Sequence, residues 1–113
     1  MNQKDINDAV DFLFTQGKVF AKAKAARIYL EEFRKTKKAI LMKSALEQKV
    51  AKTNAAAEME AYASSQYAEL LSGLRVAVEQ EEELRWALMS AQARIDVWRT
   101  LEASNQNLDK AVM

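Results

Sequence analysis

Basic side chains are concentrated in one stretch of the chain, residues 18–52. This stretch holds eleven lysines and arginines against three glutamates, whereas residues 58–102 hold nine acidic and four basic residues. Rows of cations on a helix can neutralise nucleic-acid phosphates and release their counterions. Phe20, Tyr29 and Phe33 lie in the same stretch and could stack on exposed bases. We therefore take five cations as a candidate surface for nucleic acid or an acidic partner: Arg34, Lys35, Lys37, Lys38 and Lys43.

The same charges permit a second interpretation, in which the basic and acidic stretches form two helices that pair with each other. If the chain folds back near Ser64, Lys43 and Lys49 face the acidic run at residues 79–83. Opposite charges across such a pair of helices would select an antiparallel register. The sequence favours this internal pairing and leaves direct nucleic-acid binding open.

The chain lacks the residue types that most catalytic and metal-binding sites use. Cysteine and histidine are both absent, which excludes disulfides, thiolate or imidazole metal ligands, and Cys- or His-based catalysis. The acidic run at residues 79–83 lacks the histidines that accompany glutamates in di-iron helical bundles. No glycine-rich phosphate loop is present either. We therefore expect a protein that is not an enzyme, with no catalytic, cofactor or metal site and no small-molecule substrate.

The two tryptophans occupy different positions in the hydrophobic pattern. Trp98 belongs to an apolar stripe and is expected to pack in a core. Trp86 lies off that stripe. Exposed tryptophan is favoured at the centre of protein interfaces, and a first helix that covers this side chain is the alternative explanation. We take Trp86, Arg94 and Arg99 as the candidate protein interface.

The composition predicts an all-α fold. Proline is absent, glycine occurs only at Gly17 and Gly73, and strong helix formers dominate. We expect a short helix over about residues 4–16, with Asn2 as its N-cap and Gly17 as its C-cap. Two long helices follow in a coiled-coil-like antiparallel hairpin, over about residues 18–62 and 65–104, with Ser65 as N-cap after the turn. Thr53-Asn54 is a second possible break, and the turn near Ser64 is favoured over it, with residues 54–63 helical or frayed. The tail, residues 105–113, is expected to be loose, and the whole chain to form one helical domain.

The second long helix shows the strongest hydrophobic periodicity. The predicted stripe repeats at intervals of three and four, with one irregular step from Glu81 to Leu84 that resembles a local shift of register. Its members are Tyr67, Leu71, Leu74, Val78, Glu81, Leu84, Leu88, Ala91, Ile95 and Trp98. A two-helix hairpin buries only one stripe per helix. We therefore expect a homo-oligomer, with a dimer favoured.

No segment predicts membrane insertion or export. No apolar run approaches the roughly 20 residues needed to span a bilayer. The N-terminus carries Asp5, Asp8 and Asp11 rather than the basic region of a signal peptide. We expect a cytoplasmic protein with no membrane partner.

Four short segments resemble small all-helical proteins of tailed bacteriophages and prophages. They are AYASSQY at residues 61–67, LLSGL at 70–74, ELRW at 83–86 and AQARIDVWR at 91–99. Such proteins often accompany genes for recombination and single-strand annealing. The resemblance implies a non-catalytic accessory role in DNA recombination or replication in a bacterial host cell, with a recombination protein or single-stranded DNA as partner. The alternative is a structural or adaptor coiled-coil protein, an assembly factor or an inhibitor of a host protein, that binds no nucleic acid.

Overall fold

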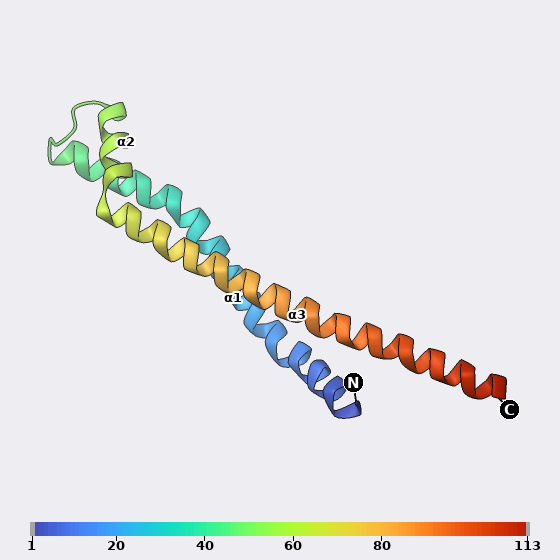
Figure 1. Cartoon of the computed structure of the whole chain (residues 1–113). Coiled ribbons are helices and arrows are strands. Elements are labelled where there is room, and N and C mark those ends of the chain that lie inside the picture. The colour runs from blue at the N-terminus through green and yellow to red at the C-terminus, as the bar shows by residue number, and fades with distance from the viewer. Residues whose placement is uncertain (1, 113) are drawn as a thin grey trace. The chain divides into compact units, whose positions relative to one another are not determined.

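The computed structural model describes residues 2–112, except for the side chain of Val112. These residues form three helices and no strand: α1 (Gln3–Glu47), α2 (Asn54–Ala63) and α3 (Ser65–Val112) (Figure 1). None of these helices is long and apolar enough to cross a membrane. The predicted all-α fold, with two long helices that pair in an antiparallel hairpin, is confirmed.

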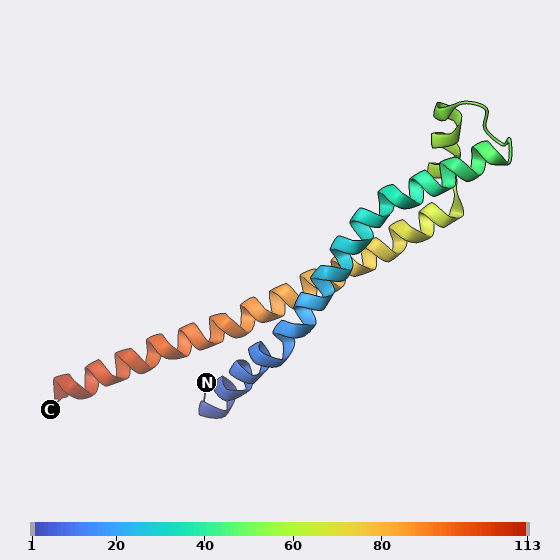
Figure 2. The same cartoon turned by 180° about the vertical axis from the view of Figure 1, so that it is seen from behind.

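The helices pack in two units. The first unit contains α1 up to Lys22 together with α3 from Glu82 onward. The second, Ala23–Glu81, contains the rest of α1, all of α2 and the beginning of α3. Within each unit α1 and α3 run side by side in opposite directions, as Figures 1 and 2 show.

The start of α1 is capped by its own first residues. The backbone N–H of Asp5 donates to Asn2 Oδ1 at 2.9 Å, and the Asn2 N–H donates to Asp5 Oδ2 at 3.1 Å. This reciprocal pair satisfies donors that the first helical turn leaves open. The predicted N-cap at Asn2 is therefore confirmed.

The predicted end of a short helix at Gly17 is wrong, because α1 continues through it to Glu47. Gly17 does not have the positive φ that a glycine C-cap requires. Leu13 and Phe20, seven residues apart and both half-buried, continue the packed face of α1 across Gly17. Packing on both sides of the glycine therefore offsets its helix penalty, which is about 1 kcal/mol relative to alanine.

The predicted long helix over residues 18–62 is also wrong, since residues 48–53 form a loop between α1 and α2. Lys49 adopts a left-handed φ of 59°, and the N–H of Val50 donates to the carbonyl of Ala45 at 3.0 Å. Thr53 caps α2 by accepting the N–H of Ala56 at 3.1 Å. Ala45, Ala51 and Ala57 form a small buried cluster. Burial of these three alanines holds α2 against the end of α1.

The predicted break near residue 64 is confirmed, but its N-cap is Ser64 rather than Ser65. The backbone of Ser64 is extended, with ψ at 140°. Its Oγ accepts the N–H of Gln66 at 3.1 Å and its carbonyl accepts the N–H of Ala68 at 3.1 Å. A serine that leaves the helical conformation can cap the following helix in this way.

The packed face of α3 has a regular heptad spacing. Its buried and half-buried members, which we call the α3 seam, alternate at intervals of three and four: Tyr67, Leu70, Leu74, Ala77, Glu81, Leu84, Leu88, Ala91, Ile95 and Trp98. The prediction is wrong at Leu71 and Val78, which are 42% and 39% exposed. With Leu70 and Ala77 in their places the irregular step disappears. Each replaced residue is the direct neighbour of an apolar residue, so hydrophobicity alone did not distinguish them.

The C-terminal residues predicted to be loose are helical, because α3 continues to Val112. Residues 99–111 are all exposed. The segment contains Leu101, Ala103, Leu108 and Ala111, which are good helix formers. Local helix propensity, rather than packing against other described residues, therefore accounts for the helical state of residues 99–111.

Candidate binding groove

Three of the predicted cations line a groove in the second unit. The groove has a volume of about 550 Å³ and is bordered by Arg34, Lys35, Lys38, Ala39 and Met42 of α1, Tyr62 of α2 and Tyr67 of α3. Residues 34, 38 and 42 are four apart, which places them on one side of α1. The loop and α2 bring Tyr62 to this side of the helix. The site therefore depends on the two chain breaks at residues 48–53 and at Ser64.

Lys38 is held at the wall of the groove by two groups from α2. Its Nζ lies 3.5 Å from a carboxylate oxygen of Glu58 and 4.8 Å from the centre of the Tyr62 ring. The pKa of Lys38 is raised, mainly by hydrogen bonding with Tyr62 and further by attraction to Glu58, although desolvation opposes the shift. Lys38 is therefore a fixed cation at neutral pH.

Two tyrosines form the aromatic part of the groove. The rings of Tyr62 and Tyr67 meet edge to face, with centroids 5.2 Å apart and an interplanar angle of 75°. Tyr67 is 8% exposed and belongs to the α3 seam, whereas Tyr62 is 47% exposed. The buried ring therefore supports the exposed one, which is available to a ligand.

Arg34 and Lys35 contribute accessible charge. Arg34 is exposed and has no ion-pair partner among residues 2–112. The Lys35 Nζ lies 3.9 Å from Glu32 within the same helix, and both side chains are largely exposed. Exposed pairs of this kind contribute little and exchange readily with other partners. The groove thus presents two accessible cations, one fixed cation and one accessible aromatic ring, which suits a ligand with anionic and planar groups.

Two of the five predicted cations do not line the groove. Lys37 is half-buried, and Lys43 is exposed, with its Nζ 3.9 Å from Glu47 on the same helix. The predicted pairing of Lys43 and Lys49 with the acidic run at residues 79–83 is wrong. The loop and α2 intervene between the long helices, so that α3 meets α1 in a different register.

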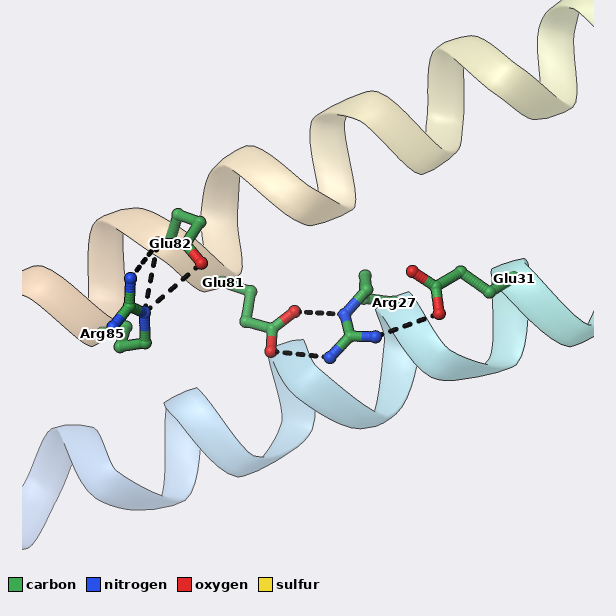
Figure 3. A network of polar contacts seen from close by, with 5 residues as sticks. All are labelled: Arg27, Glu31, Glu81, Glu82 and Arg85. Atoms are coloured by element: carbon green, nitrogen blue, oxygen red, sulfur yellow. Dashed lines mark hydrogen bonds and ion pairs between the residues drawn. The ribbon is translucent and has the colours of Figure 1, made fainter.

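The register is marked by Arg27 of α1, which contacts Glu81 of α3 (Figure 3). Arg27 Nε and Nη2 donate to the two carboxylate oxygens of Glu81 at 2.5 and 3.0 Å, and Nη1 donates to Glu31 at 3.0 Å. Hydrogen bonding to Glu81 is the main cause of a raised pKa for Arg27. Glu81 is buried in the α3 seam, so the pair is part of the helix interface.

The predicted protein interface consists of Trp86, Arg94 and Arg99. Within residues 2–112 these three side chains form no hydrogen bond or ion pair with one another. Trp86 is exposed, and the Arg85 guanidinium lies 5.1 Å from its ring centre. Arg94 borders a separate groove in the first unit, together with Asp8 and Phe12. Arg99 is paired with Asp96 at 3.6 Å on the same helix.

The tyrosines of the groove were not predicted as site residues. Their signal in the sequence is weak: Tyr62 and Tyr67 lie on either side of the break at Ser64, and only the fold shows that both face α1. The predicted stacking residues Tyr29 and Phe33 do stack on each other, with centroids 5.9 Å apart and planes 9° apart. Neither of them lines the groove.

The described residues contain no cluster of three or more side chains that could hold a metal ion. Comparisons of the chain with protein-family models, with curated proteins and with solved structures find no match. The groove and its charges are therefore the basis for a functional assignment.

Proposed function

We propose that this chain is a non-catalytic binding protein whose groove holds single-stranded nucleic acid. The observation that carries the proposal is the convergence of Arg34, Lys35 and Lys38 with the exposed ring of Tyr62 in one groove. In the proposed complex Arg34 and Lys35 contact phosphates, and Tyr62 stacks with a base.

The combination of an aromatic ring and cations favours a single strand over a duplex. Base faces are accessible only when the bases are unstacked, and aromatic side chains in basic grooves bind them with little sequence preference. Arginine can also form two parallel hydrogen bonds with one phosphate. Lys38, already held by Glu58 and Tyr62, would position the aromatic ring and add positive potential.

The proposed biological setting is DNA recombination or replication of a bacteriophage or prophage, in the cytoplasm of the bacterial host. This setting rests on the resemblance of residues 61–74 and 83–99 to small phage proteins. A recombination protein is the second proposed partner, with Trp86, Arg94 and Arg99 as contacts.

A structural or adaptor role without nucleic acid is the second candidate function. It is favoured by the ion pairs Arg27–Glu81 and Lys38–Glu58, which join helices within one chain. In this alternative the charges stabilise the hairpin and the exposed apolar residues bind a protein partner.

Fluorescence anisotropy of labelled single-stranded DNA, at low and moderate salt, separates the two functions. We expect salt-sensitive binding that weakens at least about tenfold when Arg34→Glu and Lys35→Glu are combined. Loss of two phosphate contacts should also reduce the log–log salt slope by about 1.4. The matched control combines Lys43→Glu and Lys52→Glu, an equal charge change at exposed positions outside the groove.

Each outcome has a distinct meaning. If the control weakens binding as much as the groove variant, general positive charge rather than the groove binds DNA. If the wild-type chain does not bind at low salt, nucleic-acid binding is wrong and the adaptor function becomes the stronger candidate.

A further inference from the structure

An exposed row of small and apolar side chains follows the outer side of α3. We call it the α3 outer stripe, and its members are Trp86, Ser90, Ala93, Val97, Leu101, Ser104 and Leu108. All seven are exposed, and the four large apolar residues are between 51% and 63% exposed. None of them belongs to the α3 seam, and all remain exposed to solvent within the described chain, although Ser90 also borders the groove of the first unit beside Asp8 and Phe12.

The spacing keeps the outer stripe on one side of the helix. Trp86, Val97 and Leu108 are separated by eleven residues each, which is close to three full turns. An 11-residue repeat therefore advances along a helix with little angular drift and suits a long contact with a second helix. The intermediate members fill the turns between these three positions.

The outer stripe is palindromic about Val97, since its steps are 4, 3, 4, 4, 3 and 4 residues. Reversing the helix therefore places every member opposite another member. Trp86 faces Leu108, Ala93 faces Leu101, Ser90 faces Ser104, and Val97 faces itself. This is the self-complementarity that a two-fold symmetric interface requires. Ala93 of one copy faces Leu101 of the other, so the large leucine side chain can fill the space that the small alanine leaves.

Charge does not oppose contact between two copies of the outer stripe. No member is charged, and the carboxylate next to its centre, Asp96, is already occupied. Its Oδ1 accepts a hydrogen bond from Gln92 at 3.1 Å and lies 3.6 Å from the Arg99 guanidinium. At one end, Arg85 lies over the Trp86 ring. Arg94, three residues from Val97, is the charge that lies beside the stripe, and it borders the groove of the first unit together with Asp8. The members of the outer stripe therefore add no charge of their own to the contact.

We propose that the α3 outer stripe binds the same stripe of a second copy of this chain, antiparallel and centred on Val97. The resulting dimer covers the apolar residues that the single chain leaves in water, and that burial is the driving force. The groove is formed by other residues, within 34–67, so dimer formation and nucleic-acid binding can be tested independently. Trp86 is also the proposed contact for a recombination protein, and that protein would have to compete with the second copy for this side chain.

Cysteine cross-linking tests both the contact and its direction, because the chain contains no cysteine of its own. Under mild oxidation Val97→Cys should form a disulfide-linked dimer, since the two positions meet on the symmetry axis at a distance that a disulfide can bridge. Leu108→Cys alone should not form a disulfide, because Leu108 faces Trp86 of the other copy. The double variant Trp86→Cys with Leu108→Cys should form one. Gln106→Cys, exposed on another side of α3, is the control.

Efficient self-linking of Leu108→Cys would show a parallel pairing and overturn the proposal. So would a yield for Val97→Cys no higher than that for Gln106→Cys. Light scattering gives an independent result: the wild-type mass should be twice the chain mass of 12.8 kDa. Leu101→Glu should halve this mass while circular dichroism shows unchanged helicity. The control Gln106→Glu should keep the mass of the dimer. A monomeric wild type, or a dimeric Leu101→Glu, contradicts the proposed interface.

Discussion

The Arg27 guanidinium donates two hydrogen bonds to the Glu81 carboxylate, one to each oxygen, across the interface between α1 and α3. Glu81 occupies a seam position that would hold an apolar residue in a uniform coiled coil. A charged layer at such a position is satisfied only when its partner lies directly opposite. Arg27 and Glu81 therefore select one register among those that the apolar residues would allow.

Removal of one partner should destabilise the second unit more than removal of both. Arg27→Met leaves the buried Glu81 carboxylate without its bidentate partner, and we expect the melting temperature to fall by several degrees. Arg27→Met combined with Glu81→Leu replaces the pair by apolar side chains, which often restores or exceeds the original stability. Thermal unfolding followed by circular dichroism measures both variants.

Arg75→Met is the control for this experiment, because Arg75 pairs with Glu79 on the exposed side of α3. Exposed pairs contribute little to stability, so its melting temperature should stay close to that of the wild type. The proposed role of the pair is contradicted if Arg27→Met combined with Glu81→Leu has a lower melting temperature than Arg27→Met alone. In that case the buried Glu81 carboxylate would not depend on Arg27.

The neighbours Leu70 and Leu71 provide a matched test of the α3 seam. Leu70 is half-buried in the seam, whereas Leu71 lies beside it and is more exposed. We expect Leu70→Ala to reduce the free energy of unfolding by about 2 kcal/mol, at the lower end for buried leucines. Leu71→Ala should cost clearly less in urea denaturation. The reverse order would support the irregular stripe predicted from the sequence.

Gly17→Ala should stabilise the chain. An added Cβ at this position meets nothing within 4 Å, and the backbone φ is not positive. Alanine in a helix interior is favoured over glycine by about 1 kcal/mol, so the midpoint of thermal unfolding should rise. Gly73→Ala, within α3 and equally unobstructed, should behave alike. A loss of stability in Gly17→Ala alone would indicate a helix end at Gly17.

Tyr62→Ala should weaken binding of single-stranded DNA if this ring stacks with a base. Loss of one base–aromatic stack typically costs about 1 to 3 kcal/mol, which an anisotropy titration resolves easily. Tyr29→Ala removes an exposed tyrosine of the same kind that does not line the groove. Equal effects of the two substitutions would show that the groove is not the stacking site.

The helical class of this protein follows from its amino-acid sequence without any knowledge of the packing. The absence of proline, the abundance of strong helix formers and the three- and four-residue periodicity are local properties, and they act within one or two turns of a helix. The cap at Asn2 is equally local, because Asp5 lies in the next turn. These features were predicted correctly since they require no knowledge of a distant residue.

The positions where the prediction and the structure differ depend on contacts between distant residues. Whether α1 ends at Gly17 depends on packing that continues at Phe20, and the choice between Leu70 and Leu71 depends on which side of α3 meets α1. The partner of Glu81 is Arg27, 54 residues away, and the chain path through residues 48–53 and α2 determines which cation it meets. Tertiary structure alone therefore places Tyr62 beside Lys38, because local periodicity specifies the faces of a helix and only packing selects their partners.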